Sequence, residues 1–322
     1  MSMLRFVLRR LAHGALITLG VSVLTFSMLE LAPEVSLDDL KMDATVTAGA
    51  VDSLRQAHGL TESSPVRFAR WLGSVVRGDF GLSLAHRGPV APLLWERARN
   101  TLVLAIPALL IAWLIALPLG LWTARNRGRV LDRFCTGATS TLLAVPDLLI
   151  GLFMLLVALR TGLFPTGGMF SPGATDGDLG ARARDLAHHA FLPLCAIVVS
   201  TLPMILRHVR ASAIEATHAP AVRTARGHGI RGWRLDLRYV LTIAANPLIS
   251  LAGLSIAGLL SASLLIEVVM SWPGLGPLLV EALLARDAHV VLGASMLATI
   301  FFIGGNLLAD LTLFAIDPRI RA

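Results

Sequence analysis

Charged residues are scarce in this sequence. Asp, Glu, Lys and Arg make up 15% of its 322 residues, whereas a soluble domain carries about a quarter. Hydrophobic residues make up 55%, and the mean hydropathy is +0.72. Several apolar runs reach about 20 residues, the length of a helix that crosses a bilayer. The composition therefore excludes a soluble globular protein and indicates an integral membrane protein.

Lysine and cysteine are nearly absent. The only lysine is Lys41, in DLKMDA, so no glycine-rich phosphate-binding loop with its lysine is present. We therefore expect no ATP site in this chain, and no enzymatic activity of its own. The two cysteines, Cys135 and Cys195, lie in separate apolar runs, which excludes a disulfide framework and a CxxC pair.

Other chemical signatures are missing as well. There is no HExxH sequence, and GLSIAG does not match a GxSxG nucleophile elbow. His188 and His189 are adjacent, and adjacent side chains on a helix point about 100° apart, which makes a poor chelate. We expect no catalytic residue, no metal site and no cofactor. A channel or an intramembrane enzyme remains an alternative from another class.

The apolar runs predict an all-α membrane protein with six transmembrane helices. The fourth run is short, and its helix could continue through RHVRASAIEAT. The predicted spans are Leu11–Leu31, Thr101–Ala124, Phe134–Leu159, Ala190–Leu206, Leu248–Met270 and Val290–Ile316.

The distribution of charge predicts the orientation. With the N-terminus inside, the inside segments carry 16 basic residues and a net charge of +12, and the outside segments carry 12 and a net charge of −1. Basic residues are retained on the cytoplasmic side, so we expect both termini to be cytoplasmic. The pI of 11.0 then reflects orientation and contact with lipid headgroups rather than binding to nucleic acid.

The first run could instead begin a secretory signal peptide, because LRFVLRRLAHG precedes it. The run ends in MLELAPEV without a small-x-small cleavage site, and five further runs follow. We interpret residues 1–31 as an N-terminus with an uncleaved first span.

Residues 32–99 form a long polar insert, predicted to be extracytoplasmic. TAGAVDSLRQAHGL and PVRFARWLGSVVRG have the three- and four-residue apolar spacing of short amphipathic helices. GDFGLSL and RGP are predicted breaks. Residues 160–189 are rich in Gly and Pro and are predicted to form a loop. Residues 100–322 would form a core of five spans.

A basic segment, residues 207–246, interrupts that core. Between Arg223 and Tyr239 it contains five arginines and one acid, Asp236. One explanation is plain retention of positive charge on the inside. The positions of Gly229 and Pro247 support a second explanation, in which the segment is a structured connection between two spans. Gly229 would allow a left-handed turn between two helices, and Pro247 would open the fifth span.

Seven segments, placed in order along nearly the whole chain, together form a specific pattern. They are MLRFVLRRLAHGALITLGVSVLTFSMLELAP, WLGSVVRGDFGLSL, RNTLVLAIPALLIAWLIALPLGLWTARNRGRVLDR, HAFLPL, VRTARGHGI, IEVVMSWPGLGPLLVEALLARD and NLLADLTLFAIDPRIR. Together they resemble the transmembrane permease subunit of bacterial dipeptide, oligopeptide and nickel ABC importers. WPGLG and DPRIR are the most specific parts.

The resemblance implies that the basic segment carries a short coupling helix that docks into a cleft on an ATPase subunit. In the family a glycine lies six residues after the first position of the coupling motif, and Gly229 sets the register. The motif is then Arg223, Thr224, Ala225, Arg226, Gly227, His228 and Gly229. The sequence departs from the family at HAPAV before Arg223, at Gly227-His228 and at Tyr239, which affects which ATPase would be recognised.

Four acids lie in or at the spans: Glu30, Asp147, Glu267 and Asp310. Acids at membrane depth usually face a cavity or a partner. Glu267 and Asp310 match acids common in the family, and structural and functional roles both remain open. Asp147 follows Pro146, which should kink the third span. Possible pathway-lining residues are Asp147, Glu30 and Glu267.

A stripe of small residues in the fifth span, Gly253, Ala257 and Ser261, would allow another helix to approach closely. We expect the stripe to pack against a sister permease; a wall of the translocation pathway is the alternative.

The resemblance implies a multi-pass protein of the bacterial cytoplasmic (inner) membrane. The function that it implies is ATP-driven import of peptides by alternating access. The expected partners are a second homologous permease, two ATPase subunits, an extracytoplasmic solute-binding protein and membrane lipid, with no nucleic acid. Import of nickel, a metal chelate or another small solute by the same architecture is the alternative.

Overall fold

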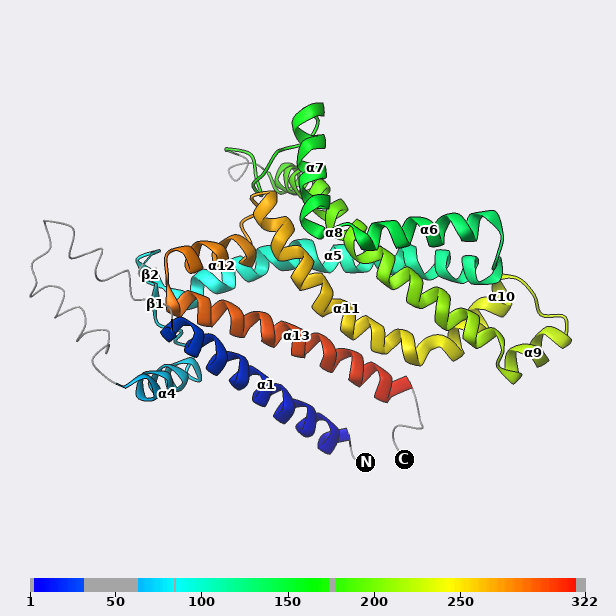
Figure 1. Ribbon diagram of the computed structural model, residues 1–322, viewed down its shortest axis with the longest axis horizontal. Helices are drawn as coiled ribbons and strands as arrows, with labels where there is room; N and C mark the ends of the chain where they lie inside the picture. Colours follow the sequence, from blue (N-terminus) through cyan, green and yellow to red (C-terminus); the bar gives the residue numbers. More distant parts are fainter. Residues whose placement is uncertain (1–2, 32–62, 84, 174–177, 317–322) are drawn as a thin grey trace, which may run out of the picture. The chain divides into compact units, whose positions relative to one another are not determined.

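The computed structural model describes residues 3–31, 63–83, 85–173 and 178–316. Helices dominate this part of the chain, and one pair of two-residue strands, β1 (Leu82–Ser83) and β2 (Gly88–Pro89), is antiparallel. The helices are labelled in Figure 1: α1 (Met3–Leu31), α4 (Ser64–Val75), α5 (Val90–Arg125), α6 (Val130–Ala144), α7 (Asp147–Thr161), α8 (Leu179–Thr217), α9 (Pro220–Gly227), α10 (Trp233–Leu235), the π-helical turn Asp236–Val240, α11 (Leu241–Val269), α12 (Leu275–Leu284) and α13 (Ala288–Ile316).

Five helical stretches of the described residues are long and apolar enough to cross a membrane, and a sixth is obtained if α6 and α7 count as one span. The two helices meet at 98°, so the predicted third span is not one continuous helix. The break falls at Val145, which is extended (φ −86°, ψ 123°), and at Pro146. A proline disfavours the α conformation of the residue before it and cannot donate to the preceding turn.

Several helices exceed their predicted spans because polar turns continue the apolar runs. α5 begins at Val90 rather than Thr101, and α8 begins at Leu179 rather than Ala190. Residues 179–189 are therefore helical, and the predicted loop is shorter. The expected continuation of the fourth span is confirmed, since α8 runs on to Thr217. Pro247 lies inside α11 rather than at its start.

The chain divides into two compact units. The first contains residues 1–10, 100–276 and 302–322, and the second contains residues 11–99 and 277–301.

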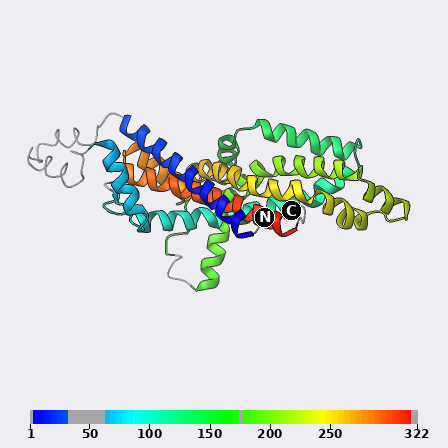
Figure 2. The same cartoon turned by 90° about the horizontal axis from the view of Figure 1, so that it is seen from below.

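The core of the first unit is built around α8, which packs against α6, α7 and α11. Figures 1 and 2 both show α6 lying along α8. Gly120 permits α5 to approach α8, because a Cβ there would lie 2.6 Å from Cγ1 of Val209. One apolar cluster reaches Val222 and Ala225 of α9, and another surrounds Trp272 and Ile197.

The first turns of α1 and the end of α13, both in the first unit, are fastened together. Phe6 stacks on Phe314 with 5.3 Å between ring centroids. Arg10 donates from Nη2 to Oδ1 of Asp310 at 2.9 Å. Asp310, one of the four span acids, therefore has an intramolecular cationic partner.

The second unit contains α4, which confirms the amphipathic helix predicted from PVRFARWLGSVVRG. Trp71 and Val75 are buried in a cluster with Leu292, Phe26 and Phe68. The other predicted amphipathic helix, residues 47–60, and the terminal DPRIR lie outside the described residues.

Candidate functional site

The basic segment folds as a helical excursion between α8 and α11. Pro220 opens α9 at a position where its missing N–H costs no hydrogen bond. α9 is followed by a turn, then by the single turn α10 and the π-helical turn. The excursion is therefore a short helix bounded by breaks, which is the local structure predicted for it.

Gly229 closes α9 with a Schellman arrangement. Its φ is +81°. Gly229 N donates to the carbonyl of Arg226 at 3.0 Å, and Ile230 N donates to the carbonyl of Ala225 at 3.1 Å. These are the two bonds of that C-terminal motif, in which glycine is favoured because L-residues disfavour positive φ. The left-handed turn predicted at Gly229 is confirmed.

One face of α9 is buried and the other is exposed. Val222 and Ala225, three residues apart, are 0% and 4% exposed and pack into the core of the first unit. The exposed members of the motif are Arg223, Thr224, Arg226, Gly227, His228 and Gly229. The helix is therefore held by its apolar face and leaves most of the motif free for contact with another molecule.

Two ion pairs connect the basic segment to the ends of α5 and α6. Arg125, the last residue of α5, lies 3.7 Å from Asp236. Arg210 of α8 donates twice to Asp132 of α6, which also accepts a hydrogen bond from Gly128 N at 2.8 Å. Sequence analysis did not single out Asp132 or Arg210. The available signal was the position of Asp132, a single acid among the arginines of ARNRGRVLDR.

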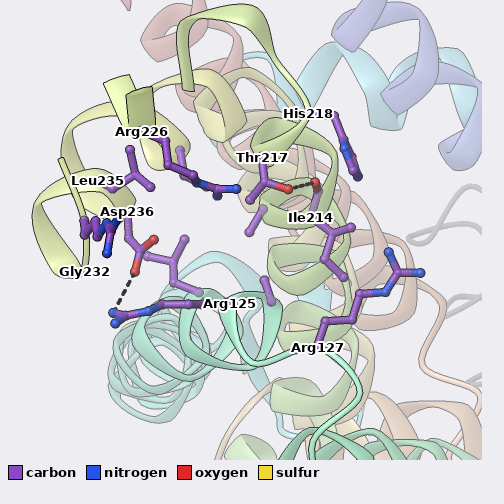
Figure 3. A pocket seen from close by; sticks show the side chains of 14 residues that line it. Arg125, Arg127, Ile214, Thr217, His218, Arg226, Gly232, Leu235 and Asp236 are labelled. Atoms are coloured by element: carbon purple, nitrogen blue, oxygen red, sulfur yellow. Dashed lines mark hydrogen bonds and ion pairs between the residues drawn. The ribbon is translucent and has the colours of Figure 1, made fainter. Parts of the chain in front are cut away.

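A pocket of about 530 Å³ opens beside α9. Figure 3 shows Arg226 extending from α9 toward Thr217, and the ion pair of Arg125 with Asp236 on the opposite wall. Most of the remaining lining is apolar and comes from α5, α8 and α10. The charged lining consists of Arg125, Arg127, Arg226, Arg231 and Asp236, with His218 beside them.

Glu267 is fully buried and bonded within its own chain. Its Oε2 accepts from Gly276 N at 2.9 Å, and Thr101 also hydrogen-bonds the carboxyl group. Its second oxygen has no partner among the described residues. Glu267 therefore hydrogen-bonds both the WPGLG turn and α5, and in this conformation it connects the two.

The WPGLG turn is held by α5 through three further hydrogen bonds. Trp272 Nε1 donates to the carbonyl of Asn100 at 2.9 Å, and Asn100 Nδ2 donates to the carbonyl of Pro273 at 2.8 Å. Leu275 N donates to Oγ1 of Thr101 at 2.9 Å. Sequence analysis missed Asn100 and Thr101, because their partners lie more than 160 residues away.

The other two possible pathway acids differ in setting. Glu30 is ion-paired with Arg67 of α4 and accepts from Ser64 Oγ at 2.7 Å, within the second unit. Asp147 is the first residue of α7 and is partly exposed. The structure thus gives Glu30 a local partner and places Asp147 at the bend between α6 and α7.

Gly253 lies against α13 of the same chain: a Cβ there would lie 2.7 Å from that of Ala309. Close packing at this position is therefore intramolecular. The side chains of Ala257 and Ser261 lie outside the described part of the structure.

His188 and His189 bond to different backbone carbonyls, those of Leu163 and Asp185. Among the described residues, no group of three His, Cys, Asp or Glu side chains could hold a metal ion.

Comparison with known proteins gives a consistent result. Residues 116–322 match the family model "Binding-protein-dependent transport system inner membrane component", and residues 3–105 match the corresponding N-terminal model. The oligopeptide transport system permease protein AppB of Bacillus subtilis is 30% identical over 99% of this chain and 100% of its own. A putative peptide permease protein of Brucella suis is 33% identical, with 99% of both chains covered.

The dipeptide transport system permease protein DppB of Escherichia coli is 30% identical, with 99% of both chains covered. Among solved structures, a chain of the MetNI methionine ABC transporter, in inward facing conformations, matches with a TM-score of 0.55 at 17% identity. The match covers 70% of this chain and 96% of that one, and it shows a shared fold.

Proposed function

The chain belongs to the family of binding-protein-dependent transport system inner membrane components, and we propose that it forms half of the translocation pathway of a peptide importer. It is a multi-pass inner membrane protein. The relatives that carry peptide names cover the whole chain, and they favour peptides over nickel or a metal chelate as the solute.

The observation that carries the proposal is the geometry of α9. It is a short helix outside the apolar spans, exposed on one face, closed by Gly229 and packed against α8, α10 and the π-helical turn. A helix packed in this way can act as a lever, because a force applied to it is transmitted to the helices that hold it. The motif Arg223–Gly229 is the proposed contact with the ATPase.

The proposed assembly has four further subunits: a second homologous permease, two ATPase subunits and an extracytoplasmic solute-binding protein. The binding protein would deliver the solute to the outer face, where the insert 32–99 is the proposed contact. ATP binding would close the ATPase subunits, and the coupled spans would reopen to the other side.

The direct test is reconstitution of this chain with a second permease, ATPase subunits and a solute-binding protein from the same organism. We expect solute-stimulated ATP hydrolysis and uptake of a labelled dipeptide or oligopeptide. Uptake of nickel or a metal chelate, but of no peptide, would keep the importer and replace the solute. Permeation without added ATP would instead indicate a channel and contradict the proposal.

A further inference from the structure

The pocket beside α9 has an excess of positive charge. Four arginines line it, Arg125, Arg127, Arg226 and Arg231, against one carboxylate, Asp236. Asp236 already pairs with Arg125. No described carboxylate lies within ion-pair distance of Arg127, Arg226 or Arg231, although Arg127 acts on Asp132 and Arg226 on Asp236 through longer-range electrostatics. Their guanidinium groups can therefore still donate to an external anion.

We propose that this pocket receives a carboxylate-bearing segment of the ATPase subunit, which makes it a second contact beside the exposed face of α9. The inference rests on the proposed function, since it assumes that α9 meets the ATPase. Guanidinium groups bind carboxylates in planar, bidentate pairs. A volume of about 530 Å³ is ample for one or two acidic side chains.

The pocket begins at the end of the predicted span on α5, at Leu121 and Ala124, and extends outward along α8, where its outer part favours an aqueous partner over a lipid headgroup. On α8 the predicted apolar span ends at Leu206, and the pocket is lined by Ala213, Thr217 and their neighbours. At a rise of 1.5 Å per residue, Thr217 lies about 16 Å beyond that end. A lipid phosphate stays near the membrane surface, whereas a soluble subunit docked on α9 would lie next to the pocket.

The pocket also joins the elements that would have to move together. Arg226 belongs to α9, Arg125 ends α5, and Thr217 ends α8. Figure 3 shows these side chains around one hollow. A carboxylate bound there would contact the coupling helix and the helices behind it at once, so ATPase movement would act on both.

The experiment compares two double variants that each remove two positive charges and leave the motif Arg223–Gly229 unchanged. Arg127→Gln/Arg231→Gln alters the pocket, because both arginines line it. Arg234→Gln/Arg238→Gln is the matched control, because both arginines are exposed and neither lines the pocket. Each variant is co-expressed with the sister permease and placed in phosphatidylcholine nanodiscs. Binding of the labelled ATPase subunits is measured over a range of salt concentrations.

For the pocket variant we expect the Kd for the ATPase to rise about tenfold or more at low salt, the size associated with loss of one charge-assisted contact. Its salt dependence should flatten, and Arg127→Lys/Arg231→Lys should restore part of the affinity. The control should stay within about threefold, as rim charges outside a site contribute little.

Equal weakening of both variants would overturn the inference, because it would show only a general attraction by positive charge. It would also be overturned if the pocket variant lost its effect on adding phosphatidylglycerol or inorganic phosphate at constant ionic strength, which would assign the pocket to a lipid headgroup or a free phosphate. Normal binding and normal coupling by the pocket variant would reject the pocket as an ATPase contact and would leave the proposed function intact. Failure of the wild-type permease to bind the ATPase would reject the proposed function itself.

Discussion

Asp132 of α6 and Arg210 of α8 form a bidentate ion pair, in which Oδ1 accepts from Nε at 2.7 Å and Oδ2 accepts from Nη2 at 2.9 Å. Asp132 is 3% exposed and also binds the turn at Gly128. The pair joins the turn after α5, the start of α6 and the helix that leads into α9.

Replacing Asp132 by Asn should therefore loosen the base of α9. Removing one charge leaves Arg210 partly buried without its partner, and we expect a loss of about 1.5–3 kcal/mol of stability. The measurement is the thermal unfolding midpoint of the assembled complex in detergent. Glu215→Gln, an exposed acid on the same α8, is the control and should leave the midpoint unchanged. Equal midpoints for both variants would show that the ion pair contributes nothing.

Gly229→Val should uncouple ATP hydrolysis from transport while the subunit remains in the membrane. Valine strongly resists the φ of +81° at this position, so the turn that closes α9 should rearrange. Solute-stimulated ATPase activity in the reconstituted complex is the readout.

Gly173→Val is the matched control for that variant. Gly173 lies in the loop after α7, outside the motif, with the same φ of +81° and open space around it. Stimulation and transport should stay normal in this variant. If Gly229→Val behaved like Gly173→Val, the turn at Gly229 would have no role in coupling.

Gly274→Ala should reduce the yield of assembled permease. A Cβ at this position would overlap Oε2 of Glu267 and lie 2.7 Å from Oγ1 of Thr101, and overpacking of this kind typically costs about 1–3 kcal/mol. The yield is measured by gel filtration after solubilisation. Gly304→Ala, with nothing near the new methyl group, should assemble normally. An unchanged yield for Gly274→Ala would mean that the WPGLG turn can move aside.

Asp147 is tested by a pair of variants, scored separately for assembly and uptake. It lies partly exposed at the start of α7, at the bend that follows α6. If it lines the pathway, Asp147→Asn should slow uptake of a solute with a free amine while assembly stays normal. Normal uptake by the Asn variant, with poor assembly of Asp147→Leu, would instead establish Asp147 as a packing acid.

The orientation predicted from charge is tested by single cysteines at Val76 and Thr224, both exposed, in a chain whose native Cys135 and Cys195 are replaced by serine. A membrane-impermeant maleimide should label position 76 in intact cells, and position 224 only after permeabilisation. Labelling of both from the same side would reverse the interpretation of the basic segment.

The sequence alone was sufficient for properties that depend on short stretches of chain. Apolar runs of about 20 residues identify membrane helices because each backbone polar group must be satisfied within its own segment. Gly229 identified its own turn, since a left-handed residue is a local requirement that glycine meets most easily. The amphipathic spacing of α4 is local in the same sense.

Tertiary structure decided what depends on partners distant in sequence. Apolarity marks where a helix enters lipid but not where its polar turns end, so the starts of α5 and α8 were misplaced. Pro146 is enough to predict a kink from the sequence. The size of the bend, 98° between α6 and α7, depends on how α7 packs against α8 and α11. Glu267, Glu30 and Asp310 look alike as isolated acids. Only the fold shows that Glu267 holds the WPGLG turn, whereas Glu30 pairs with Arg67 and Asp310 pairs with Arg10. The partner of an acid at membrane depth comes from a distant part of the chain, so the fold decides which one it is.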